Sequence, residues 1–418
     1  MRNLMISISA LIAGLLLGWL FIEFLVVHPL KMSLFLTFTL LLLGLIIVLI
    51  SALKQKKIRW IAVIMVVLAF SAGYTANTKR FLNREDPRAV PELSRKAGEV
   101  TDGHTAVVYF THGEPETYNP IGWINQFNEF DKQEIKFVPF VARPFFAYVL
   151  RNKYLEAGKS MHRQVHHEMM HTLQQQFRLD GDSATRFYIS FLDDEPRPDA
   201  AVIEALNDGA DTIIVLQVFL TISNHTAEGQ HLINDLEVEK NLGVPVIFTE
   251  PMWSSDLLKS VFLEKVYDRM EGISKDKVAV ALVGHGQPDE WDVEWATETE
   301  QEMQFREEIM DLFVQEGFKR ENLGSAWMEF KEPEPAELME AFVEHGAEKI
   351  FYFSAAISAE AMHSQIDVPR LVEKFDYPEG VETINLGAWN NHPTVIKAIK
   401  ERIDEHMPPM EVALTPEP

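Results

Sequence analysis

The chain contains no cysteine among its 418 residues. This absence excludes disulfide bonds, zinc sites built from thiolates and cysteine-ligated iron–sulfur clusters, so any metal chemistry must use histidine, carboxylate or methionine side chains. The phosphate-binding pattern G-x-x-x-x-G-K-[ST] is absent as well. This absence agrees with a mechanism that uses no nucleotide.

Basic residues are also scarce, and they are unevenly placed. Lysine and arginine number 38 against 62 aspartates and glutamates, which gives a net charge of −24. Residues 1–84 hold nine of the basic residues and one glutamate, so about −32 is left for residues 85–418. Such an acidic head repels nucleic acid and attracts cations, and no nucleic-acid partner is expected.

Charged residues are nearly missing from three runs near the N-terminus, at 5–27, 33–53 and 60–76. The first two runs are long enough to cross a bilayer, and the third is near the lower limit of length. A signal peptide would supply only one such run. The sequence therefore predicts a transmembrane anchor of three helices over residues 1–82, with the lipid bilayer as a partner.

After a polar linker predicted for residues 83–104, short apolar runs alternate with longer helical patterns. The runs predicted to be strands are 105–110, 135–141, 185–192, 211–220, 244–249, 277–284 and 348–356. Strands that are buried on both faces and separated by helices indicate a mostly parallel sheet, and so an α/β fold. The last residues, 406–418, are expected to form a disordered tail.

A repeat divides this α/β region into two similar lobes. The stretch AVVYFTHGEPE at 106–116 matches VAVALVGHGQPDE at 278–290, because each is a strand followed by H-G-[EQ]-P and an acid. A second pair of similar stretches follows later in each half. We therefore expect a first lobe over 105–270 and a second over 271–405, each with an H-G turn at the carboxyl end of its first strand.

These motifs resemble those of the class II chelatases, the ATP-independent family of ferrochelatase and the small cobalt and sirohydrochlorin chelatases. The resemblance covers about residues 105–405. It implies insertion of a divalent metal into a tetrapyrrole without a tightly bound cofactor, with the metal and the ring as partners of the protein. The strand and turn VALVGHGQP implicates His285 as catalytic or metal-binding, and the matching turn VVYFTHGEP implicates His112. VFLTISNHTAEG resembles the second histidine loop of the small chelatases and implicates His225.

The resemblance extends to two further site residues and to a late turn. SAAISAEAMHSQIDVP lies where ferrochelatases carry their active-site acid, and its H-x-x-x-D-V-P tail matches the histidine motif of the small chelatases. INLGAWNNHP at 384–393 resembles the late strand and asparagine-containing turn of the family. The catalytic residues implied in this way are His285, Glu360 and His363, and these three with His112 and His225 are the implied metal ligands.

Histidine and carboxylate suit the chemistry that this resemblance implies. Metal insertion requires two pyrrole N–H protons to leave the ring while the metal sheds its water. A histidine that titrates near pH 7 can accept such a proton and pass it on. Imidazole and carboxylate together suit Fe²⁺, and also Co²⁺ or Zn²⁺, held loosely enough to be handed over as a substrate.

A segment rich in aromatic and basic residues lies within the predicted first lobe. RPFFAYVLRNKYLEAGKSMHRQVHHEMMHTLQQQF resembles the ferrochelatase stretch in which an arginine, a tyrosine and a Gly-Ser turn lead into a long helix. The residues expected to stack on the ring or to pair with its carboxylates are Tyr118, Trp123, Arg143, Tyr148 and Arg151, with Phe145, Phe146 and Lys153 as further candidates. The alternative is that these aromatic rings pack against the membrane or the protein core.

The same stretch contains H-E-x-x-H, the pattern of zinc proteases, with His167 and His171 one helical turn apart and Glu168 beside the first. An apolar stripe lies opposite these histidines on a helical wheel. The stripe is formed by Met161, Val165, Met169, Leu173 and Phe177. Glu195, the candidate third ligand, sits in a proline-broken turn. We therefore expect a helix packed on a sheet, and the zinc protease is an alternative, as is a non-catalytic module that binds haem or metal.

Charge does not decide on which side of the membrane the head lies. Basic residues close to the spans, which the positive-inside rule compares, number five on each side. Chemistry with reduced iron and tetrapyrrole intermediates favours the cytoplasm, and the resemblance implies the same. The sequence thus predicts a multi-pass protein of the cell membrane with a cytoplasmic head, and it leaves the oligomeric state open.

Overall fold

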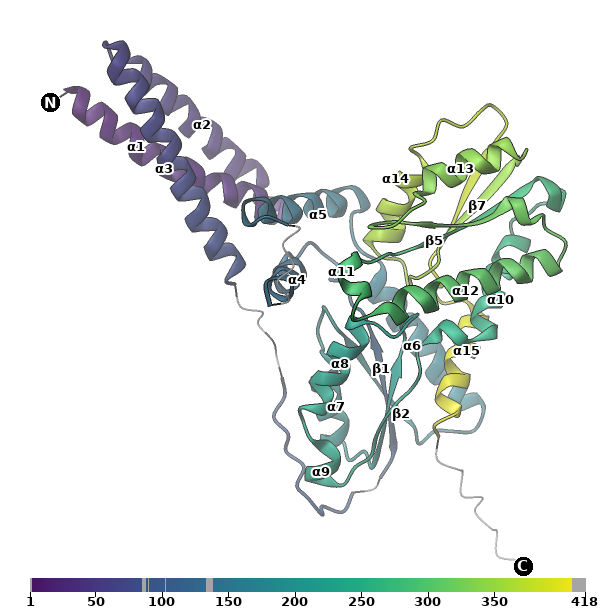
Figure 1. The fold of residues 1–418 in the computed structure, drawn as a ribbon. Coiled ribbons are helices and arrows are strands. Elements are labelled where there is room, and N and C mark those ends of the chain that lie inside the picture. The colour runs from purple at the N-terminus through teal and green to yellow at the C-terminus, as the bar shows by residue number, and fades with distance from the viewer. Residues whose placement is uncertain (1, 85–87, 89, 102, 133–137, 408–418) are drawn as a thin grey trace, which may run out of the picture. The chain divides into compact units, whose positions relative to one another are not determined.

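The structure is a computed structural model that describes residues 2–84, 88, 90–101, 103–132 and 138–407. The chain divides into two compact units (Figure 1). The anchor unit consists of Met1–Pro87 and Thr117–Lys159, and the head unit consists of Arg88–Glu116 and Ser160–Pro418. The described part of the predicted linker, 83–104, contains no helix or strand. The predicted tail lies outside the described residues from residue 408 onward.

Three long apolar helices begin the anchor unit: α1 (Arg2–Val26), α2 (Met32–Ser51) and α3 (Lys56–Leu82). By length and composition each could cross a membrane. Glycine lets α1 and α3 approach backbone to backbone. A Cβ atom on Gly18 would lie 2.1 Å from the carbonyl oxygen of Phe70, so no larger residue fits there without moving the helices apart.

A polar network joins α1 and α3 near their carboxyl ends. The side-chain amide of Asn77 donates to the carbonyl oxygen of Trp19 (2.8 Å) and to the carboxylate of Glu23 (3.1 Å). Arg80 forms an ion pair with the same carboxylate. The one glutamate of residues 1–84 is therefore paired, as a charge within an apolar helix has to be.

The anchor unit also contains a segment that the sequence places in the first lobe. It holds α4 (Ile121–Lys132), a short 3₁₀ helix (Phe140–Ala142) and α5 (Arg143–Ala157). The strand predicted at 135–141 is wrong over its described part, because Pro139 precedes a 3₁₀ turn and Pro144 lies in the first turn of a helix. The rest of that strand lies outside the described residues. Thr117–Lys159 thus interrupts the lobe that was predicted to run from 105 to 270.

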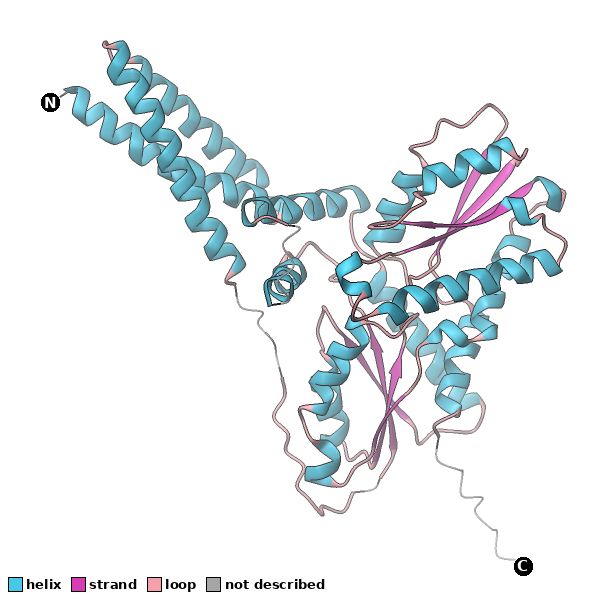
Figure 2. Cartoon of the chain, viewed as in Figure 1, coloured by secondary structure: helices cyan, strands magenta, loops and turns pink. Residues whose placement is uncertain are grey.

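The head unit contains two parallel sheets of four strands each (Figure 2). The first sheet is formed by β1 (Thr105–Thr111), β2 (Arg186–Phe191), β3 (Thr212–Gln217) and β4 (Val246–Phe248). The second is formed by β5 (Val278–Gly284), β6 (Leu323–Trp327), β7 (Lys349–Ser354) and β8 (Glu382–Gly387). Their strand orders, β2-β1-β3-β4 and β6-β5-β7-β8, are equivalent, so the predicted pair of similar α/β lobes is confirmed.

Helices pack against the sheets and between the lobes. In the first lobe they are α6 (His162–Leu179), α7 (Pro198–Asn207), α8 (Asn224–Asn234), α9 (Val238–Leu242) and α10 (Asp256–Tyr267). In the second they are α11 (Asp289–Asp292), α12 (Ala296–Gln315), α13 (Pro335–Glu344), α14 (Val368–Val372) and α15 (Pro393–Asp404). One apolar core includes buried side chains of both lobes, among them Tyr109, Leu216, Phe262 and Phe353. Because this core is shared, the strand ends of the two lobes are held in a fixed arrangement.

Candidate functional site

Two equivalent turns follow the inner strands β1 and β5. His112 follows β1, and its carbonyl oxygen accepts the N–H of Asp193, which follows β2 (2.8 Å). His285 follows β5, and its carbonyl oxygen accepts the N–H of Glu329, which follows β6 (3.1 Å). The predicted H-G turns therefore lie at the carboxyl ends of the strands, where open α/β sheets bind their ligands.

Each of these histidines is held in one tautomer by its own turn. The Nδ1 atom of His112 lies 2.9 Å from the carbonyl oxygen of Gly113, and that of His285 lies 2.7 Å from the carbonyl oxygen of Gly286. A carbonyl oxygen only accepts, so Nδ1 carries the hydrogen and Nε2 keeps the lone pair of the neutral ring. The two glycines have φ values of +86° and +82°, which a residue with a Cβ atom rarely adopts.

A second histidine in each lobe completes a pair. His225 lies in the first turn of α8, after β3, and its ring centroid is 4.6 Å from that of His112. His363 opens a π-helical turn after β7, and its ring centroid is 5.3 Å from that of His285. The Nδ1 atom of His363 lies 2.8 Å from Oδ2 of Asp367. A carboxylate also only accepts, so Nε2 of His363 keeps its lone pair as well.

The two pairs influence each other although they belong to different lobes. Burial, followed by the charges of His112 and His285, holds the pKa of the His225 imidazole well below its usual range. A histidine with such a low pKa keeps its lone pair at neutral pH, which favours metal binding over protonation. The structure thus brings together four of the predicted site residues, here called the histidine cluster: His112, His225, His285 and His363.

Glu114 is a site residue that the sequence analysis does not single out. Burial raises the pKa of its carboxyl, whereas the Ser160 hydroxyl and the charges of His363 and His112 lower it. The carboxylate accepts the N–H of Met362 (3.0 Å) and the hydroxyl hydrogen of Ser160. Glu114 therefore contacts both lobes, and one histidine of each pair lowers the pKa of its carboxyl. Its signal in the sequence is the acid of the H-G-E-P turn, two residues after the histidine.

The second lobe has Gln287 in place of this acid and receives carboxylates from α12 instead. Oε1 of Glu302 accepts the backbone N–H of His285 (2.9 Å). Burial raises the pKa of Glu298 to about 7, while His285 lowers it and neighbouring carboxylates raise it further. These acids make the surroundings of His285 attractive to a cation.

Glu360 is engaged in a different set of contacts. Its Oε1 accepts the N–H of Ala388 and the side-chain amide of Asn390, both at 3.0 Å, and its Oε2 accepts the hydroxyl hydrogen of Ser364 (2.7 Å). In the described part of the chain, all hydrogen bonds of this carboxylate go to residues 364–390. The predicted role of Glu360 as catalytic acid and ligand therefore stays a prediction, while its visible role is to hold the turn after β8.

Two buried histidines of α6 were not anticipated by the sequence pattern. Nδ1 of His166 lies 2.9 Å from the Tyr109 hydroxyl, and its Nε2 lies 3.2 Å from the hydroxyls of Thr111 and of Ser358 in the second lobe. Burial, with the charges of other histidines, lowers the pKa of His166 to about 3. The ring of His162 lies 4.4 Å from that of His166, centroid to centroid. His166 thus links the lobes as a neutral hydrogen-bonding group.

The H-E-x-x-H residues lie on the other side of the same helix. His167, Glu168 and His171 are exposed, and Glu168 accepts the side-chain amide of Gln164 (2.9 Å). Four members of the predicted apolar stripe are buried: Val165, Met169, Leu173 and Phe177. Among the residues that the structure describes, no three histidine, aspartate or glutamate side chains are arranged to hold a metal ion. The third ligand that a zinc protease needs is thus not provided to this motif.

The residues predicted to bind the ring lie in the anchor unit, where some of their polar atoms have internal partners. Tyr118 donates its hydroxyl hydrogen to the carbonyl oxygen of Val26 (3.0 Å), and Arg151 is fully buried. Arg143 forms an ion pair with Asp131. Aromatic contacts of Trp123 with Phe127 and Phe146, and of Tyr148 with Phe24, complete this packing. Ring binding by Tyr118, Trp123, Arg143, Tyr148 and Arg151 stays a prediction.

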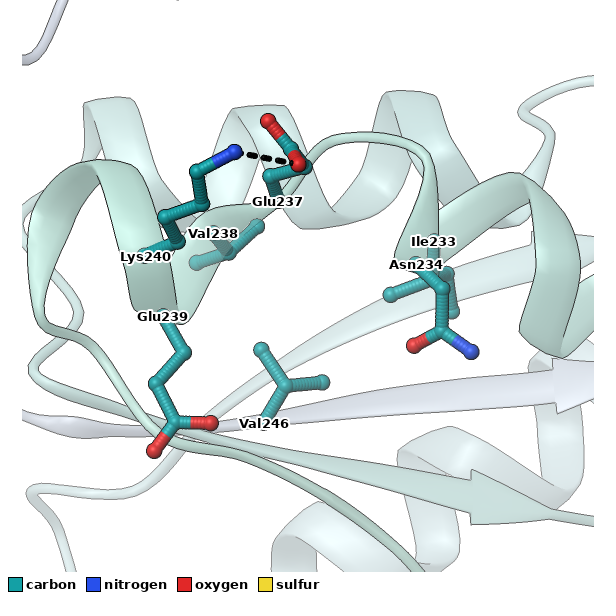
Figure 3. A pocket seen from close by; sticks show the side chains of 7 residues that line it. All are labelled: Ile233, Asn234, Glu237, Val238, Glu239, Lys240 and Val246. Carbon is teal, nitrogen blue, oxygen red and sulfur yellow. Dashed lines mark hydrogen bonds and ion pairs between the residues drawn. The ribbon is translucent and has the colours of Figure 1, made fainter.

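A shallow depression of about 420 Å³ lies elsewhere in the first lobe (Figure 3). It is lined by residues of α8, α9 and β4, and an ion pair of 2.6 Å between Lys240 and Glu237 lies at its edge. None of the four clustered histidines lines it. We assign it no part in the chemistry.

In a comparison with protein families, residues 279–406, which make up most of the second lobe, match the CbiX family model. Both histidines of its pair, His285 and His363, lie inside the matched residues. The predicted resemblance to the class II chelatases is therefore confirmed. No curated protein matches the chain.

Solved chelatase structures are similar to the chain at low sequence identity. SirB from Bacillus subtilis with Fe³⁺ is 15% identical, with 72% of this chain and 95% of SirB covered and a TM-score of 0.44. The sirohydrochlorin chelatase SirB from Bacillus subtilis subspecies spizizenii, in complex with cobalt, is 12% identical, with 72% and 94% covered and a TM-score of 0.45. CbiX, the terminal enzyme for biosynthesis of siroheme in denitrifying bacteria, is 12% identical, with 73% and 100% covered and a TM-score of 0.39.

Proposed function

We propose that the protein is a membrane-anchored chelatase that inserts a divalent metal ion into a tetrapyrrole without ATP. Fe²⁺ is the proposed metal, and Co²⁺ and Zn²⁺ are the alternatives. The observation that carries the proposal is the histidine cluster, which takes one pair of imidazoles from each lobe. In His112, His285 and His363 the Nδ1 hydrogen is engaged and the Nε2 lone pair is left for a metal ion or a proton.

The proposal assigns the metal ion to one histidine pair and the protons to the other. His285 and His363, which lie beside Glu302 and Asp367, hold the metal ion through Nε2. Two protein donors bind less firmly than three or four, so the four pyrrole nitrogens can replace them. The metal therefore leaves the protein for the ring in small steps of ligand exchange.

Proton removal is assigned to His112 of the other pair. The ring releases two N–H protons as it takes up the metal, and a neutral imidazole accepts one proton at Nε2. Oδ2 of Asp193 lies 3.5 Å from Nε2 of His112 and stabilises the imidazolium that forms there. Because burial holds the pKa of His225 low, that ring stays neutral, so His112 accepts the two protons one after the other and passes each to water.

An absorbance assay tests this proposal on the purified full-length protein in detergent. Free porphyrin and its metal complex have different visible bands, so insertion of Fe²⁺ or Zn²⁺ is followed directly. We expect conversion that depends on the protein and that no nucleotide accelerates. A porphyrin spectrum that shifts on binding but never becomes that of the metal complex would contradict the proposal.

A second function is favoured by one observation. Glu360, the implied active-site acid, accepts hydrogen bonds from Ser364 and from the turn after β8. If that acid is indispensable, the protein binds haem or metal without inserting it. Ring binding without metallation, in the assay above, is the result that this alternative predicts.

The proposal includes a cytoplasmic head on a multi-pass membrane anchor. The three apolar helices support the anchor, and the need for reduced iron supports the cytoplasm. A reporter that fluoresces only in the cytoplasm, fused to Pro418, tests the orientation. A dark fusion beside an active reporter of the outer side would place the head outside.

A further inference from the structure

The turn after β8 is shaped around the carboxylate of Glu360. Besides the three hydrogen bonds that this carboxylate accepts, the side-chain oxygen of Asn390 accepts the backbone N–H of Glu360 (3.0 Å). A Cβ atom on Gly387 would lie 2.0 Å from Oε1 of Glu360, so only glycine fits there. Gly387 and Asn390 have left-handed backbone, with φ values of +67° and +59°. One side chain thus determines much of the geometry of this turn.

A lysine of the first lobe binds the same turn. Nζ of Lys265, on α10, donates to the carbonyl oxygens of Leu386 (3.1 Å) and Ala388 (2.5 Å). The N–H of Ala388 donates to Glu360, so Ala388 is bound by both charged groups. Burial lowers the pKa of Lys265 to about 8, and the charge of Glu360 raises it. The two residues therefore interact across the lobes through the turn that lies between them.

Glu360 also holds the segment that carries His363. Its Oε2 accepts the hydroxyl hydrogen of Ser364, which is the second residue of the π-helical turn. The same hydroxyl accepts the N–H of Ala361 (2.9 Å). Glu360 thus connects the turn after β8 to the backbone on which His363 stands, and a change at Glu360 or Lys265 is transmitted to this proposed metal ligand.

These contacts do not suit the carboxylate of Glu360 to proton transfer. Oε1 already faces two donors of the protein, and Oε2 faces one. A proton taken up by either oxygen would compete with a hydrogen that is already bound there. Displacing one of these donors would leave a polar group of the turn without an acceptor, which costs free energy.

We propose that Lys265 and Glu360 are positioning residues, which together fix the π-helical turn that presents His363 to the metal ion, and that Glu360 is not the acid of the reaction. This inference rests on the proposed chelatase function, in which His363 is a ligand and His112 accepts the protons. Groups that orient a metal ligand typically contribute about 10- to 100-fold to metal affinity.

The role of Glu360 is tested on the full-length protein in detergent with Co²⁺, whose visible absorption changes when histidine replaces water as a ligand. Glu360→Ala removes every acceptor from the turn, so we expect Co²⁺ to bind about tenfold more weakly or worse. Glu360→Gln keeps an oxygen for the donors at Oε1. Its amide nitrogen can donate to the Ser364 hydroxyl, which then donates to the carbonyl oxygen of Ala361 (3.1 Å).

Glu360→Gln should therefore rescue both measurements. We expect its Co²⁺ affinity and its metallation rate to lie within about threefold of the wild type, because a positioning residue needs its hydrogen bonds and not its charge. Normal Co²⁺ binding with metallation slowed about 10²-fold would show that Glu360 is the acid, and would overturn this inference.

Lys265→Met tests the contribution of the first lobe, and Lys349→Met is its matched control. Lys349 also donates to a backbone carbonyl oxygen, that of Arg269 (3.4 Å), but it stands at the start of β7, at the end of the sheet opposite His363. We expect both variants to melt at a lower temperature and only Lys265→Met to bind Co²⁺ about tenfold more weakly. Equal Co²⁺ affinities of the two variants would overturn the role of Lys265. A wild type that binds Co²⁺ but metallates no ring would overturn the chelatase function, while the Co²⁺ affinities would still decide the positioning roles.

Discussion

Replacing His285 tests whether the histidine cluster performs the chemistry. The Nε2 lone pair of this residue is the group that the proposed mechanism uses, and alanine removes it. A positioned acid, base or ligand of this kind contributes about 10²-fold or more to the rate. We therefore expect His285→Ala to slow metallation by about two orders of magnitude, which corresponds to about 2.7 kcal/mol of activation free energy.

The same substitution leaves the fold intact, because the structural contribution of the side chain is small. The ring makes one hydrogen bond, from Nδ1 to the carbonyl oxygen of Gly286. Its loss reduces the free energy of unfolding by about 1 kcal/mol. His285→Asn separates the two roles, since an asparagine amide can still donate to Gly286 and has no nitrogen lone pair to offer. We expect this variant to melt like the wild type and to be as slow as the alanine variant.

The matched control is His167→Ala combined with His171→Ala. These residues are of the same type but are exposed on α6. Metallation by the double variant should stay within about twofold of the wild type, measured by initial rates of absorbance change at saturating metal. If the double variant lost activity while His285→Ala kept it, the assignment of the site would be wrong.

Three further variants test the packing around the site and in the anchor. Gly18→Val should lower the melting temperature of the full chain in detergent by several degrees, because the added carbons overlap the backbone of α3. Gly44→Val on α2 is the control and should leave the melting temperature unchanged, since the space around Gly44 is open. Glu302→Ala should destabilise the head by about 1–3 kcal/mol, because the variant loses the acceptor for the backbone N–H of His285 and the negative charge near the buried guanidinium of Arg306. A thermal shift like that of Glu302→Gln would refute the contribution of the charge. The pKa of His166 is about 3 in the folded chain and near 6.5 in the unfolded chain. Below pH 6.5 the unfolded chain therefore binds a proton that the folded chain does not bind. The free energy of unfolding then falls by up to about 1.4 kcal/mol per pH unit. Melting temperatures between pH 7 and 4 should therefore decline more steeply for the wild type than for His166→Asn.

The strands were predictable wherever they are continuous apolar runs. Six of the seven predicted strands are present, because strands buried on both faces leave that signature. Strands β6 and β8 lack this signature and both lie at the edges of their sheet. LGSAW of β6 contains glycine and serine, and ETINLG of β8 is only partly buried. The false strand at 135–141 is apolar for another reason, because its described residues belong to the anchor unit and not to a sheet.

The histidine cluster was predictable because its members stand in repeated motifs at strand ends. The sequence could not show in which direction each side chain points. Glu360 lies in the right segment, yet its carboxylate hydrogen-bonds the turn after β8. His166 lies in a histidine-rich helix, yet its burial depends on Tyr109 and Ser358, which are distant in sequence. Such contacts come from tertiary packing and leave no local pattern.

Glu114 and Gln287 occupy equivalent places in the two lobes, and their difference makes the candidate site asymmetric. A pair of identical chains related by a two-fold axis would present the same side chain twice. Here the lobes share one chain, so one H-G turn carries an ionisable group and the other a neutral amide. In the proposed mechanism, a ring bound at the histidine cluster would therefore meet an ionisable group from one turn and a neutral amide from the other.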